Sequence, residues 1–292
     1  MKFNGIFTAL LTPFDGNDKI NAKALEQLVK HNIDMGVTGF YVTGSTGESF
    51  LLSTDERKEV MEIIKSAAPD KTLIAHIGSL NENEAKELGR HANKLGYDAV
   101  SSVTPFYFKF SFDEIKGYYN RLADASGLPM LVYHIPAFSG VNMGKGEIES
   151  FLNDDKFLGV KFTSNDFFTL EQCKTAFPDK IFYNGYDEMF LSGLSMGVDG
   201  AIGSTYNFMA DKFVQIYNHF NNGEIAKAQA IQKEANRIIT VLIKLGVMHA
   251  EKEVLNQLGI DFGHCRKPFN ELSAEAKEVI KKEIMPFICP IK

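Results

Sequence analysis

The stretch Phe157-Leu-Gly-Val-Lys-Phe-Thr163 is a short apolar run that contains one charged residue, Lys161. Its length and composition are typical of a buried β-strand. A lysine in apolar surroundings loses hydration of its ammonium form, so its pKa falls and more free amine is available to attack a carbonyl. The alternative is an ordinary lysine on an edge strand, with its ammonium group in water. The choice depends on whether the sheet has an edge at this strand.

Further apolar runs of similar length are distributed along the chain. With the first run included, they begin near Gly5, Gly39, Thr72, Asp98, Met130, Phe157, Ile181 and Asp199. The starts lie roughly 20 to 35 residues apart, which is the length of a βα unit. The segments between them carry amphipathic helical patterns, and Ser53-Thr-Asp-Glu56 has the sequence of a capping box. Eight such alternations predict an α/β fold of the (β/α)8 TIM-barrel class rather than an open doubly wound sheet.

The pattern changes after Asn207, where only helical segments are expected. They cover residues 213–220, 226–245, 250–258 and 273–284. The first can serve as the eighth helix of the barrel. This predicts a barrel in residues 1–222 and a C-terminal helical extension in residues 223–292. No low-complexity linker separates the two parts, so we expect the extension to pack on the barrel.

The composition is that of an ordinary globular protein: 292 residues, 45% hydrophobic and 23% charged, with a formal net charge of -6. The basic residues are dispersed, so we expect neither nucleic acid nor an anionic membrane as a partner. The sequence has no apolar run of about 18 residues and no signal-type N-terminal segment. The three cysteines form no C-x-x-C pair. These features predict a cytoplasmic protein with reduced thiols.

In a barrel of this class, functional groups lie at the carboxyl ends of the strands and in the loops that follow. The loop after the second strand, Thr43-Gly-Ser-Thr-Gly-Glu48, has glycines, hydroxyls and amides that can bind a small anion. Such a sequence also makes ordinary turns, so alone it is a weak signal. It lacks the lysine of a nucleotide P-loop, which disfavours nucleotide binding.

Tyr133 lies near the end of the fifth strand and Lys161 near the end of the sixth. Adjacent strands lie about 4.8 Å apart, so the phenol and the amine can meet if both face the interior. The loops after the last two strands contain Asp187, Glu188 and Ser204, which suit a polyhydroxylated ligand, although acidic residues also favour helix N-termini. The seven histidines do not pair at metal-ligand spacing, and no cysteine lies at a strand end. Neither a metal site nor a thiol nucleophile is predicted.

Together, these residues resemble the N-acetylneuraminate lyase and dihydrodipicolinate synthase superfamily of class I aldolases, over essentially the whole chain. The resemblance implies that Lys161 forms the Schiff base and that Tyr133 is the catalytic tyrosine. It implies that the loop 44–48 binds the carboxylate of pyruvate. It also implies a homotetramer in which Tyr107 of a neighbouring protomer joins Ser45 and Tyr133 in a hydrogen-bond relay. Such chemistry needs no metal or other cofactor, because the iminium is the electron sink.

Several details resemble the sialic acid lyase branch of this superfamily. Phe138 stands where synthases carry an arginine. His134 replaces an asparagine common in that branch, and we expect it to face away from the site. The implied activity is reversible cleavage of N-acetylneuraminate (sialic acid) to N-acetylmannosamine and pyruvate. The residues that the resemblance assigns to substrate binding are Ser45, Thr46, Thr163, Gly185, Asp187, Glu188 and Ser204.

Three alternatives remain open from the sequence. A synthase that condenses pyruvate with aspartate semialdehyde would use the same lysine, and Phe138 argues against it. A barrel glycosidase would need two carboxylates across a cleft, whereas Asp187 and Glu188 are neighbours in the chain. A catalytically silent binding protein can keep the same fold. The presence of both Lys161 and Tyr133 argues against that alternative.

Overall fold

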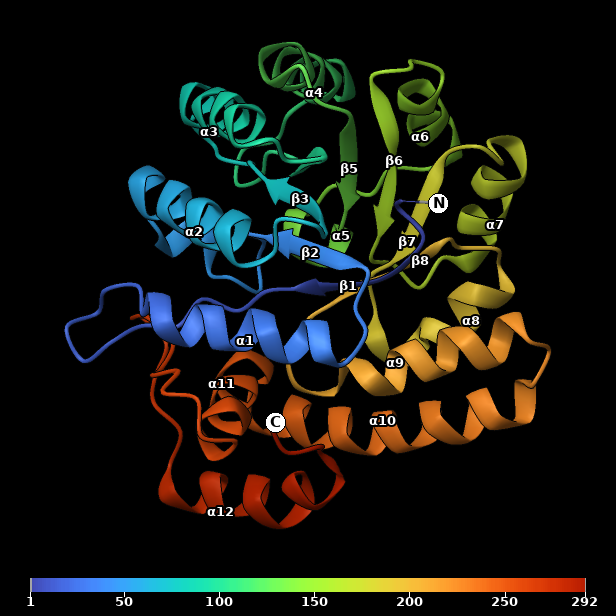
Figure 1. Ribbon diagram of the computed structural model, residues 1–292. Coiled ribbons are helices and arrows are strands. Elements are labelled where there is room, and N and C mark those ends of the chain that lie inside the picture. Colours follow the sequence, from blue (N-terminus) through green and yellow to red (C-terminus); the bar gives the residue numbers. More distant parts are fainter. Residues whose placement is uncertain (1, 292) are drawn as a thin grey trace.

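The computed structural model describes residues 2–291, and its parallel strands close into a barrel. The strands are β1 (Gly5–Ala9), β2 (Gly39–Val42), β3 (Thr72–His76), β4 (Ala99–Val103), β5 (Met130–His134), β6 (Phe157–Phe162), β7 (Ile181–Asn184) and β8 (Gly200–Gly203). Each strand pairs with the next along the chain, and β8 pairs with β1 (Figure 1). The predicted (β/α)8 TIM barrel is confirmed. Because a closed barrel has no edge, the edge-strand interpretation of Lys161 is wrong.

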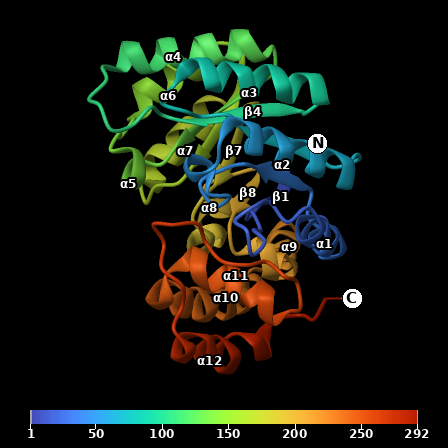
Figure 2. The same ribbon diagram turned by 90° about the vertical axis from the view of Figure 1, so that its left-hand side faces the viewer.

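Helices follow the strands and surround the barrel, as Figures 1 and 2 show. They are α1 (Ala22–Asp34), α2 (Thr54–Ala67), α3 (Glu82–Leu95), α4 (Phe112–Ser126), α5 (Pro136–Ser139), α6 (Lys145–Leu152), α7 (Phe167–Ala176), α8 (Phe190–Ser195) and α9 (Tyr206–Asn221), with 3₁₀ turns η1 (Ser49–Leu51) and η2 (Asp187–Met189). The predicted capping box of α2 is confirmed, because Ser53 and Glu56 exchange both hydrogen bonds, at 2.8 and 3.2 Å. The helix expected from residue 213 begins earlier, and its backbone bends at Met209.

Two hydrophobic clusters lie on opposite sides of the barrel wall. Successive side chains of a strand point to opposite faces, so the strands supply both clusters. On β5, Leu131 and Tyr133 belong to the cluster inside the barrel, whereas Met130 and Val132 belong to the cluster between strands and helices. Lys161 of β6 pairs with Tyr133 in the strand register. The pleat therefore places the lysine inside the barrel beside the tyrosine.

The C-terminal extension covers one side of the barrel, in orange and red at the bottom of Figure 1. It consists of α10 (Ile225–Leu245), α11 (Val247–Gln257), α12 (Ala274–Glu283) and the turn η3 (Met285–Phe287). Helix α10 packs along α9, and α11 contacts both of these helices. Leu242 and Val254 of the extension belong to the same hydrophobic cluster as the outer face of the strands. These contacts agree with an extension that packs on the barrel, and the division into residues 1–222 and 223–292 stays a prediction.

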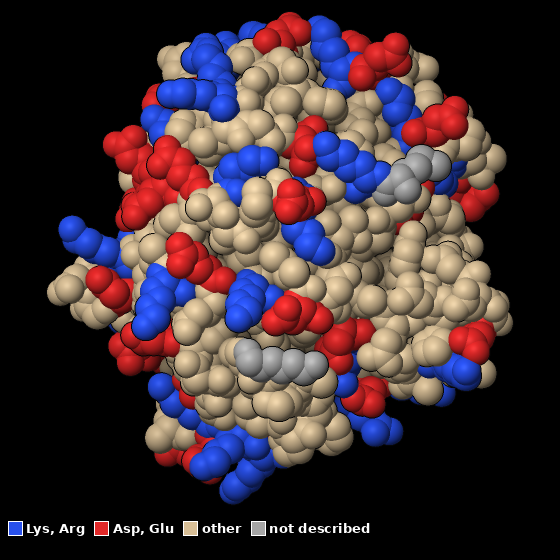
Figure 3. Space-filling model, in the orientation of Figure 1, with Lys and Arg blue, Asp and Glu red and all other residues tan. Residues whose placement is uncertain are grey.

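The surface carries charges of both signs. Figure 3 shows acidic and basic side chains interspersed on one face, in agreement with the dispersed basic residues of the sequence. Within residues 2–291, no helix is long and apolar enough to cross a membrane.

The packing of β6 on β7 leaves no room for a side chain at Gly159. A Cβ atom at this position would lie 1.8 Å from the backbone oxygen of Ile181. We expect Gly159→Ala to lower the free energy of unfolding by about 3 kcal/mol, because backbone cannot yield as a flexible side chain does. Chemical denaturation followed by circular dichroism measures this change.

Gly146→Ala is the matched control for this substitution. Gly146 lies in α6, and a Cβ atom there meets nothing within 4 Å. The control should keep the stability of the wild type or raise it by up to about 1 kcal/mol, because alanine is the better helix former. An unchanged unfolding midpoint for Gly159→Ala would contradict the close approach of the two strands.

Candidate active site

A cavity of about 280 Å³ lies at the carboxyl end of the barrel. It collects side chains and backbone from the ends of β2, β5, β6, β7 and β8, as expected for this fold. The predicted site residues that line it are Ser45, Thr46, Tyr133, Lys161, Thr163, Gly185, Asp187, Glu188 and Ser204. Tyr107 is the exception, because its side chain is 85% exposed and lies outside this cavity.

Lys161 lies in the barrel interior with only 5% of its surface exposed. Its Nζ lies 4.0 Å from the ring centroid of Tyr133 and 4.6 Å from that of Tyr41. Burial lowers the pKa of Lys161 to about 7, because the ammonium form loses hydration, and the charge of Asp187 partly opposes this shift. A large fraction of the amine is therefore uncharged near neutral pH, as a carbonyl nucleophile requires. Tyr41 is not among the site residues predicted from the sequence.

Tyr133 holds its proton at neutral pH. Burial raises the pKa of its phenol to about 12, and the hydroxyls of Thr163 and Ser45 lower it. A phenol of this kind can donate a proton to an oxyanion beside it and take a proton back in the reverse direction. The next residue, His134, packs against Phe162 with 5.0 Å between ring centroids and does not line the cavity. The expectation that His134 faces away is confirmed.

The loop 44–48 contributes Ser45 and Thr46 to the lining of the cavity. Its turn is closed by hydrogen bonds of 3.0 Å from Gly47 N–H to the Gly44 oxygen and from Glu48 N–H to the Ser45 oxygen. The N–H groups of Ser45 and Thr46 donate to no acceptor within residues 2–291. Unused amides that converge in a tight turn favour a small anion such as a carboxylate.

His76 supports this loop from inside the barrel wall. Its Nε2 accepts from Val103 N–H at 3.2 Å, so Nδ1 carries the proton and donates to the Thr43 oxygen at 3.0 Å. Burial lowers the pKa of His76 well below its ordinary value and keeps this neutral tautomer. Thr43 has a φ of 55°, a left-handed conformation that is rare for a β-branched residue. The histidine thus stabilises a strained residue next to the anion loop.

Asp187 anchors the opposite side of the cavity. Its Oδ2 accepts hydrogen bonds from the N–H and the hydroxyl of Thr205, at 3.0 and 2.7 Å. Burial raises the pKa of Asp187 to about 6, while these two bonds lower it. Only a glycine fits at position 203, because a Cβ atom there would lie 1.8 Å from Asp187 Oδ1. The backbone of β8 therefore approaches the carboxylate directly.

Buried polar atoms without a partner gather around this side of the cavity. Within residues 2–291, Thr163 Oγ1, Asp187 Oδ1, the Tyr206 hydroxyl and Glu251 Oε2 have no partner in good hydrogen-bond geometry, although Thr163 lies near Tyr133 and Asp187 near Tyr206. Buried polar groups are usually paired, and exceptions call for an explanation. A cluster of such atoms next to one cavity indicates a site for a ligand that carries several polar groups.

The extension forms one wall of the cavity, through residues 239, 242 and 243 of α10 and residues 247 and 248 of α11. Lys252 of α11 is buried and forms an ion pair with Glu48 of the anion loop at 2.5 Å. The other oxygen of Glu48 accepts from Arg266 N–H at 2.8 Å. None of these residues is among the site residues predicted from the sequence. The ion pair holds the anion loop against the extension.

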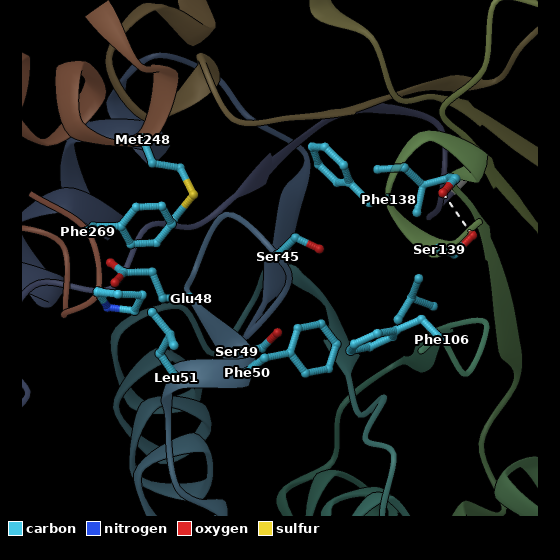
Figure 4. A pocket seen from close by; sticks show the side chains of 13 residues that line it. Ser45, Glu48, Ser49, Phe50, Leu51, Phe106, Phe138, Ser139, Met248 and Phe269 are labelled. Atoms are coloured by element: carbon cyan, nitrogen blue, oxygen red, sulfur yellow. Dashed lines mark hydrogen bonds between the residues drawn. The ribbon is translucent and has the colours of Figure 1, made fainter. Parts of the chain in front are cut away.

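A second, apolar cavity of about 330 Å³ adjoins the first, and both are lined by Ser45 and Phe138. Figure 4 shows Ser45 between Phe138 on one side and Phe269 on the other. Phe50 and Phe106 close a further side, with 4.8 Å between their ring centroids. The polar cavity therefore adjoins an apolar cavity that is large enough for an aromatic side chain.

An α/β barrel whose cavity combines a buried amine, a neighbouring phenol and an anion-binding loop has the arrangement of a class I aldolase, in which an amine forms an imine with a carbonyl substrate. Comparison with known proteins agrees with this class. The chain belongs to the Dihydrodipicolinate synthetase family, which it matches over residues 2–286.

Individual relatives are similar over nearly their full length. An N-acetylneuraminate lyase of Haemophilus influenzae is 46% identical over 282 residues, which are 96% of this chain and 96% of the relative. The structure of CdNal from Clostridium difficile in complex with mannosamine matches with a TM-score of 0.93 and 43% identity, over 96% of this chain and 97% of the other. The structure of N-acetylneuraminate lyase from Fusobacterium nucleatum complexed with pyruvate matches with a TM-score of 0.91 and 44% identity, over 97% and 98%.

The low pKa of Lys161 can be measured without any substrate. As the pH rises through about 7, the ammonium group loses its proton and the fraction of free amine grows. Brief reductive methylation with formaldehyde should therefore modify Lys161 about tenfold faster at pH 8 than at pH 6 and level off above pH 8. Mass mapping of the digest measures the rate, and the exposed lysines of the same digest provide the reference. A rate that rises steeply only above pH 9 would contradict a desolvated amine.

Proposed function

We propose that the protein catalyses reversible aldol cleavage of N-acetylneuraminate to N-acetylmannosamine and pyruvate through a Schiff base on Lys161. The observation that carries the proposal is the position of the Lys161 amine beside the Tyr133 phenol. Both groups line one cavity with Ser45 and Thr46, whose N–H groups are unused. The similarity to N-acetylneuraminate lyases supports this choice of substrate.

The first half of the proposed reaction captures the substrate. Nζ of Lys161 attacks the C2 ketone of the open-chain sugar, and loss of water gives an iminium. The neighbouring carboxylate binds the N–H groups of Ser45 and Thr46. The rings of Tyr41 and Tyr133 flank Nζ at 4.6 and 4.0 Å, and aromatic faces stabilise a cation in a cavity with little water.

The second half breaks the carbon–carbon bond. The C4 hydroxyl passes its proton to the Tyr133 oxygen while the phenol proton of Tyr133 moves to the substrate carboxylate. The C3–C4 bond breaks in the same step, and its electron pair moves into an enamine. N-Acetylmannosamine leaves as the aldehyde. Protonation of the enamine at C3 and hydrolysis of the imine then release pyruvate and restore the amine. No metal ion or other cofactor takes part in this route.

The opposite side of the cavity favours a polyhydroxylated aldehyde over aspartate semialdehyde. We assign Thr163, Gly185, Asp187, Glu188 and Ser204 to the hydroxylated chain of the sugar. The semialdehyde brings a second carboxylate, whose charge the two acidic side chains would repel. The cationic side chain that lines this cavity is Lys161, which the Schiff base uses. Position 138 is a phenylalanine and so offers no positive charge. A second carboxylate would therefore lack a partner.

Borohydride trapping combined with a product assay tests the proposed reaction. The wild type should release pyruvate from N-acetylneuraminate, and reduction should add the mass of the pyruvate adduct to Lys161. Lys161→Ala should abolish trapping. Tyr133→Phe should still trap pyruvate and lose on the order of 100-fold in kcat, because proton transfer is impaired while the amine is intact.

Lys145→Ala, an exposed lysine of α6, is the control and should behave as the wild type. If borohydride still traps pyruvate on the Lys161→Ala variant, Lys161 is not the nucleophile. Faster condensation of pyruvate with aspartate semialdehyde than with N-acetylmannosamine would favour the synthase alternative.

We also propose a homotetramer in which Tyr107 completes the site of a neighbouring protomer. Tyr107 has a φ of 76°, a left-handed conformation that is uncommon outside glycine. It contacts Phe108, which contacts Phe110, and all three rings are exposed. An exposed aromatic patch of this kind is typical of a protein–protein interface. The apolar cavity beside Ser45 offers the aromatic ring of a second copy a place next to the relay.

Subunit mixing tests whether Tyr107 acts across an interface. Lys161→Ala and Tyr107→Phe should each have low activity when prepared alone. After both variants are unfolded together and refolded, mixed oligomers contain sites with an intact Lys161 from one copy and an intact Tyr107 from another. Cleavage activity should then return to roughly a quarter of the wild type, as expected for random pairing in closed symmetric oligomers. Activity no higher than that of the separate variants would contradict a contribution from a second copy.

A further inference from the structure

Glu251 of α11 is a buried carboxyl group that the proposed reaction does not use. Its side chain is fully buried. Oε1 accepts a hydrogen bond from the Ser204 hydroxyl at 2.7 Å, and Oε2 has no partner within residues 2–291. Ser204 itself lines the cavity. The carboxyl group therefore stands directly behind a residue assigned to the sugar.

Among residues 2–291, no lysine or arginine forms an ion pair with Glu251. The next residue, Lys252, forms its ion pair with Glu48. The helix residues around Glu251 include the buried Ala250, Val254 and Leu255. Burial raises the pKa of Glu251 to about 8, a shift that the Ser204 bond opposes and the charge of Asp187 increases. At neutral pH the group is therefore mainly an uncharged carboxylic acid. Because Oε1 accepts from Ser204, the carboxyl proton belongs on Oε2.

We propose that Glu251 is a positioning residue that fixes the Ser204 hydroxyl for the polyhydroxylated half of the substrate. A serine hydroxyl has one proton and two lone pairs. When its proton is engaged by Glu251 Oε1, its lone pairs remain for the cavity, so Ser204 accepts a hydrogen bond from a substrate hydroxyl. The proposal rests on the proposed function and assigns to α11 a part in substrate recognition.

A purely structural role for Glu251 would have the opposite effect on stability. A buried carboxyl group with one unpaired oxygen and no cation is costly to bury, and an apolar side chain of similar volume is often neutral or stabilising at such a position. The Glu251 carboxyl group therefore raises the affinity for the substrate and lowers the free energy of unfolding. Stability and affinity should respond in different directions to its removal.

Steady-state kinetics of four variants test the proposal: Glu251→Leu, Glu251→Gln, Ser204→Ala and the double variant Glu251→Leu/Ser204→Ala. Glu251→Leu should raise KM for N-acetylneuraminate about five- to tenfold, the effect of losing one hydrogen bond, with KM for pyruvate in the condensation direction unchanged. Glu251→Gln keeps an acceptor oxygen and should stay within about twofold of the wild type. The double variant should be no weaker than Ser204→Ala alone, because both changes remove one interaction. The unfolding midpoint of Glu251→Leu should not fall.

Glu253→Gln is the matched control, because Glu253 lies on the same helix, faces Lys277 at 3.3 Å and does not line the active-site cavity. It should retain both KM values. Additive effects in the double variant, equal rises in both KM values, or a Glu251→Gln variant as weak as Glu251→Leu would each overturn the proposal. A wild type that traps pyruvate and cleaves N-acetylneuraminate, with an unchanged KM in Glu251→Leu, overturns this inference alone. A wild type that does neither overturns the proposed function.

Discussion

Closure of the β-barrel determines the chemistry of Lys161. Strand β6 is paired on both sides, by β5 and by β7, so its inward side chains have no access to bulk water at an edge. Nζ is enclosed by the rings of Tyr41 and Tyr133, which only partly replace the hydration that the ammonium group loses on burial. The ammonium form is therefore disfavoured, and the pKa falls to about 7. The nucleophilic state of the amine follows from topology and needs no dedicated base.

The anion loop depends on a second constraint, which comes from the C-terminal extension. A site built from backbone N–H groups binds a carboxylate only if its backbone is held in one conformation. Glu48 has a φ of 59°, and the buried ion pair with Lys252 fixes its side chain in this conformation. Arg266 extends the contact to Glu56, and this guanidinium lowers the pKa of that carboxyl to about 2. The extension is therefore part of the active site.

The sequence carried enough information for the fold and for the positions of Lys161 and Tyr133 in the cavity. Lys161 and Tyr133 could be found because period-two patterning and strand ends place them at equivalent positions of neighbouring strands. The alternation of side chains along β2 also points Tyr41 into the barrel, so the sequence contained the pattern that identifies it. Glu251 lies four residues after Val247 and is surrounded by buried residues of the helix, so a carboxylate on an apolar stripe was also visible.

Other features of the site have no local signal. The hydrogen bonds that hold Asp187 come from Thr205, on a loop after a different strand, and depend on how closely the backbone at Gly203 approaches. The exposed position of Tyr107 depends on a loop conformation that no periodicity encodes. The contribution of α10 and α11 to the cavity wall depends on the angle at which the extension meets the barrel. Such features depend on tertiary packing, and sequence patterns do not predict them.

The two halves of the cavity are therefore constrained in different ways. On the imine side, backbone amides, paired strands and barrel-interior rings form the site, and none of these can change without disturbing the barrel itself. On the sugar side, the groups are side chains at strand ends and on α11, several with buried polar atoms that the protein leaves unpaired. These side chains can be exchanged at a modest cost in folding, because a buried polar atom without a partner destabilises the folded state. Sequence change in such a barrel should therefore alter the aldehyde that is recognised, through positions such as Phe138, Ser204 and Glu251, while the capture of the keto acid by Lys161 persists.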